Sequence, residues 1–105
     1  KSDINQTSSV GGYQKSTSVY GCEELIGNVF EWTRSRKKEY PYLAGDGREK
    51  LARGGTDWTV LRGGSWRGSE RYQRCSARYD DLPYYGYDVG GFRLALSPFF
   101  DSGLW

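Results

Sequence analysis

Glycine pairs divide this chain into segments that are too short for long helices or long strands. The 105 residues include 15 glycines, and pairs of glycines occupy positions 11–12, 54–55, 63–64 and 90–91. Glycine is favoured where the backbone bends sharply or passes close to another segment, because a side chain would clash there. We therefore expect a loop-rich domain in which short strands are joined by irregular loops.

Four short segments have the composition of strands. Residues 29–33 alternate apolar and polar side chains, which is typical of a half-buried strand. The expected strands are residues 29–33, 59–62, 75–78 and 92–96. Residues 20–27 are expected to form one helical turn that ends at Gly27, and residues 34–57 are expected to form a long polar loop. The fold class predicted is α+β, with short antiparallel strands and little helix.

The chain is long enough for a single domain, residues 1–105, with a core that depends on aromatic side chains. Hydrophobic residues make up 36% of the sequence and aromatic residues 16%. We expect Trp32, Trp58 and Trp66 to lie in the core, because each is large enough to dominate the packing around it. A domain of this size buries only about 60–65% of the surface of its unfolded chain, so we expect marginal stability.

The charge of the chain is nearly balanced, with 15 basic and 13 acidic residues and a net charge of +2. This balance does not favour nucleic acid as a partner, because nucleic-acid binders concentrate positive charge on one face. The sequence has no run of 18 apolar residues, so we expect no membrane insertion. The basic run at residues 34–38 is interpreted as a solvated loop rather than a phosphate or membrane patch.

The absence of histidine removes several kinds of chemistry from this chain. With no histidine in the sequence, it can form neither a Ser–His nor a Cys–His nucleophile pair, and it cannot hold a histidine-ligated metal by itself. Cys22 and Cys75 are expected to be two separate buried thiols, and a disulfide between them is the alternative.

Two groups of motifs carry a family resemblance. One lies in residues 20–33 and includes Gly-Asn-Val-Phe-Glu-Trp-Thr, and the other begins with Arg-Gly-Gly-Ser-Trp at residues 62–66. The second group continues with Arg-Cys-Ser-Ala-Arg at 74–78 and Gly-Phe-Arg at 91–93. Together they resemble the C-terminal half of a formylglycine-generating-enzyme-type domain, the sulfatase-modifying-factor branch of the C-type lectin fold. The resemblance implies that fold, with the N-terminal half absent, minimal or present as a separate chain.

The resemblance also implies a structural calcium site in the first motif. Carried over by position, the carbonyl groups of Gly27 and Val29 and the carboxylates of Glu24 and Glu31 would surround the ion. Calcium takes six to eight hard oxygen ligands, and carboxylates supply the charge that it needs. The alternative is that Glu31 bonds backbone amides in a tight turn without a metal.

The enzymes that this chain resembles use two cysteines, between the Gly-Gly-Ser and Arg-Cys motifs, to bind copper. Here the interval at residues 67–73 contains no cysteine and so offers no thiolate to copper(I). We therefore expect no copper site, no formylglycine synthesis and no enzymatic activity. A related branch, the sulfoxide synthases of ergothioneine biosynthesis, holds a histidine-ligated iron in another part of the protein. This chain could be only an auxiliary part of such an enzyme.

Tyrosine is concentrated in the interval between Arg67 and Val89, which holds five of the nine tyrosines. Tyrosine interleaved with Ser, Gly and Asp is typical of protein-binding surfaces, and the pattern resembles variable proteins that are diversified by retroelements. The predicted ligand-binding residues are Ser69, Glu70, Tyr72, Tyr79, Asp80, Asp81, Tyr84, Tyr85, Tyr87 and Asp88.

The sequence is therefore interpreted as a non-catalytic display domain that binds a protein or cell-surface ligand. One alternative is a plain binding or scaffold module. The other is the C-terminal part of a formylglycine-generating-type oxidoreductase, or a degenerate relative of one. Arg62, Arg78 and Arg93 are expected to bond buried carbonyls or carboxylates rather than a ligand, because a guanidinium group satisfies several acceptors at once.

Overall fold

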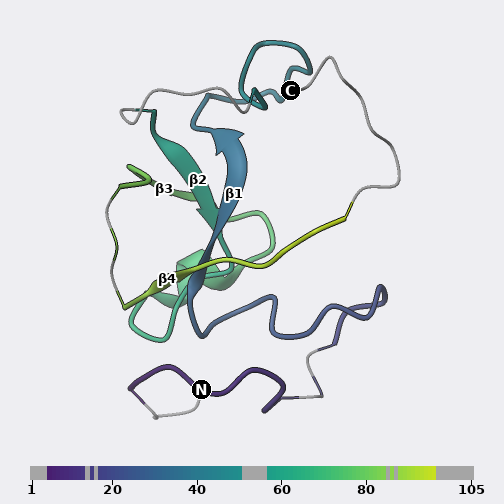
Figure 1. Ribbon diagram of the computed structural model, residues 1–105, viewed down its shortest axis with the longest axis vertical. Helices are drawn as coiled ribbons and strands as arrows, with labels where there is room; N and C mark the ends of the chain where they lie inside the picture. The colour runs from purple at the N-terminus through teal and green to yellow at the C-terminus, as the bar shows by residue number, and fades with distance from the viewer. Residues whose placement is uncertain are drawn as a thin grey trace.

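The computed structural model describes residues 5–13, 15, 17–50, 57–84, 86 and 88–96. Its centre is one curled four-stranded sheet with the strand order β3-β2-β1-β4 (Figure 1). The strands are β1 (Phe30–Arg36), β2 (Thr59–Arg62), β3 (Tyr79–Asp81) and β4 (Gly90–Gly91). A short 3₁₀ helix, η2 (Glu70–Gln73), begins after the cap residue Ser69. The described fold is thus made mostly of strands, with little helix.

The pairing of β1 with β2 forms the middle of the sheet. The two strands run antiparallel, with Trp32 opposite Leu61 and Arg36 opposite Thr59. From Trp32 to Arg36, β1 advances four residues while β2 goes back only two, so the ladder is widened there. The Thr33 hydroxyl donates to the carbonyl of Val60 at 2.9 Å inside this widened stretch. A side chain therefore satisfies a carbonyl in the stretch where the regular backbone ladder is interrupted.

The hydrophobic core is small and lies against the middle of the sheet. Phe30, Val60, Leu61 and Ala77 are the buried apolar residues among those described, and Leu61 has no exposed surface at all. β-Branched and aliphatic side chains suit the interior of β2, where both faces are covered. Most of the buried apolar side chains therefore come from β2 and from Phe30, the first residue of β1.

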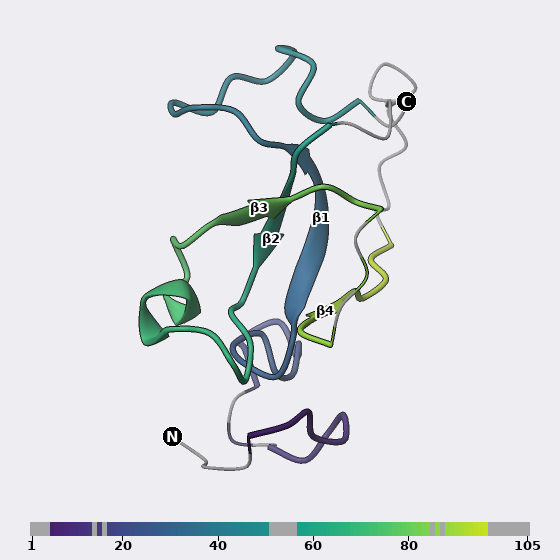
Figure 2. The ribbon, with the colours of Figure 1, turned by 90° about the vertical axis from the view of Figure 1, so that its left-hand side faces the viewer.

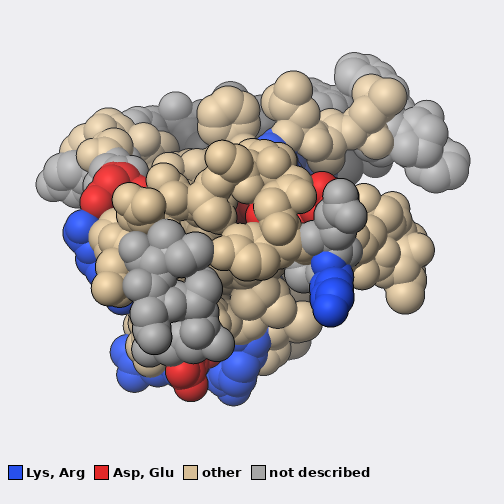
Figure 3. Space-filling view, turned by 90° about the horizontal axis from the view of Figure 1, so that it is seen from below, with Lys and Arg blue, Asp and Glu red and all other residues tan. Residues whose placement is uncertain are grey.

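Two loop regions lie at opposite ends of the sheet. Residues 37–50 form an irregular loop beyond the end of β1, and the N-terminal residues lie beyond the other end (Figures 1 and 2). Uncharged atoms cover most of the described surface at the N-terminal end (Figure 3). Val10, Val19 and Tyr20 are among the exposed apolar side chains of this N-terminal segment. The loop at residues 37–50 carries the Asp46–Arg48 ion pair and Glu49, whose carboxylate accepts a bond from the Ser35 hydroxyl.

The glycine pair after β2 is required by the backbone. Gly63 has a φ of +95° and Gly64 a φ of +72°, which side chains other than glycine rarely adopt. A Cβ atom on Gly63 would lie 2.8 Å from the carbonyl oxygen of Leu25. The close approach expected at this pair is confirmed, and it holds the 20–29 segment against the end of β2 through a bond from the Gly27 amide to the Gly63 carbonyl.

The structure corrects several expectations about secondary structure. The strand at 59–62 is confirmed and the strand at 29–33 nearly so, since β1 begins at Phe30 and continues to Arg36. The third strand lies at Tyr79–Asp81 instead of 75–78, and no strand covers 92–96, where pairing stops after Gly91. The helical turn expected at 20–27 is absent from that described segment. The β1–β4 pair is parallel, so the sheet is not wholly antiparallel.

Expectations about the core were also partly wrong. Trp58 is 50% exposed, and Trp32 and Trp66 are only partly buried. Arg67 stacks on the Trp66 ring with 4.6 Å between the guanidinium carbon and the ring centroid. Both cysteines are free and exposed rather than buried thiols. The domain is too small for its sheet to cover these side chains.

Within the described part of the chain, no helix is long and apolar enough to cross a membrane.

We predict that the free energy of unfolding depends sharply on Leu61. The substitution Leu61→Ala should lower it by ~2–5 kcal/mol. Removal of this fully buried side chain would leave a cavity beside Trp32 and Tyr79, the residues opposite it on β1 and β3. Leu96→Ala is the matched control, since Leu96 is 97% exposed and should change stability by less than ~0.5 kcal/mol. Urea unfolding of both variants measures the difference, and equal effects would contradict the position of the core.

Candidate functional site

A pocket lies over the widened part of the β1–β2 ladder. It has a volume of about 370 Å³, including the part that opens to solvent. Three segments converge on it: the second half of β1, the loop at 37–50, and the facing ends of β2 and the segment before β3. Its lining residues are Thr33, Ser35, Arg36, Tyr40, Tyr42, Arg48, Val60, Arg62 and Arg78. Four arginines and two tyrosines in one pocket make it suited to a small, polar ligand with an anionic group.

Arg48 fixes the loop that forms one wall of the pocket. Its side chain is 4% exposed and makes a two-pronged ion pair with Asp46, with Nη2 2.7 Å from Oδ2 and Nε 3.1 Å from Oδ1. Nη2 also donates to the carbonyl groups of Glu39 and Pro41. The guanidinium carbon lies 4.8 Å from the centroid of the Tyr42 ring. One buried cation thus ties together three parts of the loop.

The same ion pair shifts the acidity of both partners. The side-chain hydrogen bond from Arg48, and then its backbone hydrogen bond, lower the pKa of Asp46 from 3.8 to about 2. The hydrogen bond with Asp46 raises the pKa of the Arg48 guanidinium. Both groups therefore remain charged throughout the neutral range.

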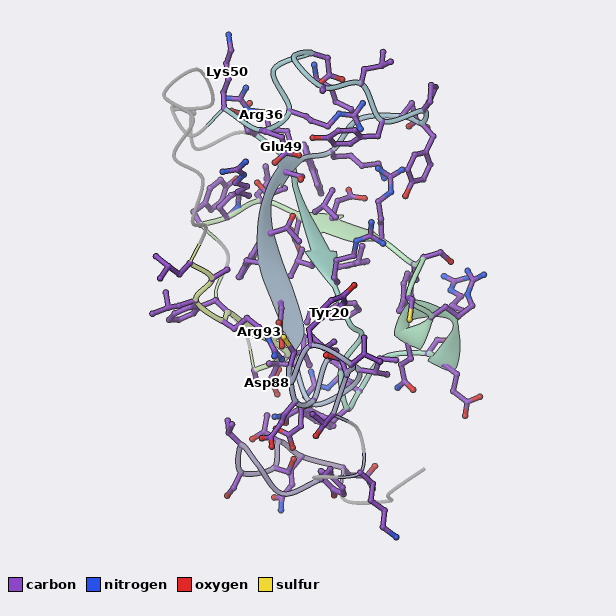
Figure 4. All side chains as sticks on the ribbon, turned by 90° about the vertical axis from the view of Figure 1, so that its right-hand side faces the viewer. Tyr20, Arg36, Glu49, Lys50, Asp88 and Arg93 are labelled. Atoms are coloured by element: carbon purple, nitrogen blue, oxygen red, sulfur yellow. The ribbon has the colours of Figure 1, made fainter. Side chains whose placement is uncertain are left out.

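Ion pairs also neutralise other cations around the pocket. Arg36 Nε lies 3.1 Å from Asp57 Oδ2, and Arg36 Nη1 donates to the carbonyl of Gly47 at 2.9 Å. Lys37 Nζ donates to Asp80 Oδ1 at 2.7 Å. Arg36 and Glu49 lie at the loop end of the sheet, whereas Asp88 and Arg93 lie at the opposite end (Figure 4). These pairs stabilise the rim and leave its charge balanced.

The two remaining arginines of the pocket bond carbonyl groups instead of carboxylates. Arg62 Nη1 donates to the carbonyl of Ala77 at 2.8 Å and to that of Cys75 at 3.3 Å. Arg78 Nη1 donates to the carbonyl of Lys38 at 2.8 Å, and its guanidinium carbon lies 4.0 Å from the centroid of the Tyr40 ring. The expected bonds from these arginines to carbonyl groups are confirmed. Within the described ranges, neither arginine forms an ion pair with a carboxylate.

Two of the tyrosines predicted to display a ligand-binding surface pack inside an aromatic cluster. The ring of Tyr79 stacks on Phe30 with 5.1 Å between centroids. The ring of Tyr72 meets Phe30 edge-on at 5.9 Å and Tyr79 at 5.5 Å. These contacts stabilise the sheet against η2.

The other predicted ligand-binding residues are spread over several elements. Ser69 caps η2, Glu70 begins it, and both are exposed. Asp80 pairs with Lys37, and Asp88 pairs with Arg67 at 2.8 Å. Asp81 accepts a bond from the amide of Leu82, and Tyr84 is exposed. Tyr85 and Tyr87 lie outside the described residues.

Two of the four residues predicted to bind calcium contact an arginine. The Glu31 carboxylate pairs with the Arg93 guanidinium through both of its oxygens, and the Glu31 hydrogen bond raises the pKa of Arg93. Arg93 also donates to the carbonyls of Glu23 at 2.8 Å and Glu24 at 3.1 Å. The contact of Arg93 with a carboxylate and carbonyls confirms its expected role.

The remaining predicted calcium ligands make other contacts. Glu24 Oε2 accepts a bond from the Gly11 amide, whereas its buried Oε1 has no hydrogen-bond partner in the described part of the molecule. The Gly27 amide bonds the Gly63 carbonyl, and Val29 lies against Gly91. No group of three or more His, Cys, Asp or Glu side chains suited to a metal lies within the described residues. Calcium binding by Glu24, Gly27, Val29 and Glu31 stays a prediction.

Comparison with known protein families shows to which family this chain belongs. Residues 1–98 match the family described as the sulfatase-modifying factor enzyme 1-like domain. The chain belongs to this family. The match agrees with the motifs at 20–33 and 62–66, and extends over the pocket and the whole described sheet.

Three curated relatives that the chain matches are each named hercynine oxygenase. The chain is 38% identical over 88 residues to the hercynine oxygenase of Mycobacterium tuberculosis (strain ATCC 25618 / H37Rv), covering 82% of this chain and 21% of that enzyme. It is 35% identical over 99 residues to the hercynine oxygenase of Mycolicibacterium smegmatis, covering 89% of this chain and 23% of the enzyme. The hercynine oxygenase of Mycolicibacterium thermoresistibile is 32% identical over 99 residues, with coverage of 89% and 22%.

The chain therefore spans about a fifth of the length of the hercynine oxygenases that it matches. No solved structure gives a significant match.

These matches overturn the interpretation of the chain as a non-catalytic display domain and the expectation that it is no enzyme. The matched relatives are named as oxygenases, and the alignments cover most of this chain. They give no support to the resemblance to retroelement-diversified proteins. One physical reason for the error is that two of the five tyrosines that suggested a binding surface, Tyr72 and Tyr79, pack on Phe30.

Sequence reasoning missed the pocket. Arg36 lies in the basic run that was interpreted as a solvated loop, but β1 extends to it and its side chain is partly buried. Tyr40 and Tyr42 flank Pro41, and this Tyr-Pro-Tyr sequence was a signal of aromatic side chains in an otherwise polar loop. No such signal marks Arg48 in the sequence. Its contacts with Asp46, Glu39 and Pro41 depend on the conformation of the 37–50 loop, which no periodic pattern predicts.

We predict that Asp46 stabilises the loop above pH 4 and loses this effect near pH 2. Its pKa is 3.8 ordinarily and about 2 in the folded chain, so its contribution is present above the unfolded pKa and disappears as the pH falls through the folded one. Asp46→Asn should lower the urea midpoint at pH 7, and the gap from the wild type should close towards pH 2. Asp88→Asn removes an exposed ion pair and should change little. A pH-independent gap for Asp46→Asn would contradict this account.

Proposed function

We propose that this chain forms the formylglycine-generating-type part of an oxygenase that acts on a small histidine-derived substrate, as hercynine oxygenases act on hercynine. The observation that carries the proposal is the alignment of three hercynine oxygenases with 82–89% of the chain. The role that we assign to these residues is to bind and orient the substrate in the pocket at the loop end of the sheet.

We further propose that the sheet and its loops form a C-type lectin-like fold. Short strands, little helix and long irregular segments support this proposal, and so does membership of the sulfatase-modifying-factor family. In such a fold a small sheet holds loops whose side chains make the ligand contacts. The loop at 37–50, anchored by Arg48, would then be one of the functional loops.

The residues of this chain do not fit the histidine-ligated iron of the sulfoxide synthases that it resembles. The sequence has no histidine, and the described side chains bring together no set of three or more potential metal ligands. The metal would have to be held by residues outside this chain. The proposed function therefore assigns substrate binding, and no step at the metal, to the residues described above.

The chemistry of the pocket suits the groups of hercynine. Hercynine is a histidine with three methyl groups on its amino nitrogen, so it carries a quaternary ammonium group and a carboxylate. Quaternary ammonium groups bind to aromatic faces, and Tyr40 and Tyr42 are each more than half exposed at the pocket. Because Arg78 and Arg48 lie over one face of these rings, the ammonium group would use the other face. Guanidinium groups bind carboxylates through paired hydrogen bonds, and four arginines line the same pocket.

The direct test of this proposal is hercynine-dependent oxygen consumption by the native protein purified from its source. A low-molecular-weight thiol should be added as the sulfur donor that a sulfoxide synthase requires. The proposal expects oxygen uptake that needs hercynine, with a product that mass spectrometry detects. If the folded native protein takes up no oxygen with hercynine and any of several thiols, the proposed function is wrong.

We predict that Tyr42→Ser raises the KM for hercynine in this assay. The expected increase is about two- to five-fold, which corresponds to the loss of one cation–π contact at a partly exposed site. Tyr20→Ser is the matched control, because Tyr20 is 90% exposed and lies at the opposite end of the molecule (Figure 4). Thermal unfolding should show that both variants remain folded. An equal KM for the two variants would place the substrate elsewhere.

A further inference from the structure

Arg62 ends β2, and Arg78 immediately precedes β3, the neighbouring strand. In the β2–β3 ladder, Val60 lies opposite Asp80 and Leu61 lies opposite Tyr79. Arg62 and Arg78 each come one position beyond the last of these pairs, and both side chains line the pocket. The fold thus brings two guanidinium groups to the same pocket.

The acids beside this pair in the sheet already have other cations as partners. Glu31, which lies opposite Arg62 in the β1–β2 ladder, pairs with Arg93. Asp80, the nearest acid along β3, pairs with Lys37. The other two pocket arginines have carboxylate partners, Asp57 for Arg36 and Asp46 for Arg48. Arg62 and Arg78 contact only carbonyl groups and one aromatic ring among the described residues. They are the two pocket arginines with positive charge left over for a ligand.

Both arginines are also held in place before any ligand arrives. Arg62 bonds two carbonyls through Nη1, and Arg78 bonds the Lys38 carbonyl and stacks on Tyr40. In both residues Nη1 is the nitrogen used within the described part of the chain, which leaves Nη2 and Nε to donate to a ligand. A side chain that is already fixed loses little conformational freedom when it binds.

We propose that Arg62 and Arg78 form a carboxylate-binding subsite, which holds the carboxylate group of the substrate between them. The inference rests on the proposed function, because it identifies which group of the substrate the pocket recognises. A planar guanidinium matches a planar carboxylate through two parallel hydrogen bonds. One carboxylate placed between the two arginines would neutralise part of their charge.

Isothermal titration of the 105-residue chain with hercynine and with hercynine amide tests this proposal. The amide keeps the quaternary ammonium and imidazole groups but lacks the negative charge. We expect the amide to bind about ten- to a hundred-fold more weakly, the loss expected for a charge-assisted hydrogen-bond pair. If the two ligands bind equally well, Arg62 and Arg78 do not recognise the carboxylate and the proposal is overturned.

A second measurement separates this proposal from the proposed function. Titration with sodium acetate, followed by NMR of the arginine Nε–Hε signals, should give saturable shifts for Arg62 and Arg78. The control signal is that of Arg67, which is exposed and outside the pocket. If hercynine does not bind but acetate shifts these two signals, the subsite stands and the assignment to a hercynine-type substrate fails. If acetate leaves them unchanged, or if only inorganic phosphate shifts them, the carboxylate subsite is wrong.

The substitution Arg78→Gln tests whether the carboxylate subsite needs both arginines. Arg78→Gln should remove the acetate response of Arg62 along with its own, because the subsite needs both guanidinium groups. Arg67→Gln should leave that response unchanged. Urea unfolding shows whether Arg78→Gln remains folded, and the comparison of hercynine with its amide on the wild-type chain needs no variant at all. A folded Arg78→Gln chain with an unchanged Arg62 response would overturn the proposal.

Discussion

The antiparallel pairing of β1 with β2 supports both the core and the pocket. In the regular part of the ladder, Trp32 lies opposite Leu61, and the side chains of Phe30 and Leu61 in this part are buried in the core. The widened part between Trp32 and Arg36 lies beside the pocket, and Thr33 closes the gap by bonding the Val60 carbonyl. Irregular strand pairing is common where a side chain is redirected towards a functional site. Here it places β1 side chains at the wall of a pocket instead of in a continuous ladder.

Ion pairs with carboxylates stabilise the fold around the pocket and neutralise some of its cationic side chains. Arg48 holds the loop at 37–50 through Asp46, and Arg36 and Lys37 each have their own carboxylate. This leaves the charge of Arg62 and Arg78 available in the pocket. The division explains how a chain with a net charge of only +2 presents a locally positive pocket. The small sheet thus forms a rigid base for the pocket, and the loop at 37–50 adds the side chains of Tyr40, Tyr42 and Arg48 to its lining.

The sequence predicted those parts of the fold that depend on local backbone chemistry. The strand at 59–62 follows from its β-branched and aliphatic residues, and the turn at Gly63-Gly64 follows from the positive φ that glycine permits. The family motifs were also sufficient to predict the sulfatase-modifying-factor family. The strand at 79–81 was misplaced by four residues, because alternation around Ala77 does not show where pairing with β2 begins.

The site was harder to predict because tertiary contacts decide it. The composition of residues 67–89 suggested an exposed binding surface, but composition does not show which face a tyrosine occupies. Tyr72 and Tyr79 turn towards Phe30, a residue more than forty positions away from either. The pocket likewise brings Tyr42 and Arg78 together from distant segments. Only the folded arrangement shows that these segments meet in one pocket at the loop end of the sheet.

Mapping hercynine contacts by amide NMR on the 105-residue chain tests this central claim most directly. The account predicts that hercynine shifts the amide signals of pocket residues such as Thr33, Ser35, Tyr42 and Arg48, and leaves those of Ser69, Glu70 and Tyr84 unchanged. Shifts that cluster at Ser69, Glu70 and Tyr84 instead would contradict it, because they would return the binding surface to the tyrosine-rich interval.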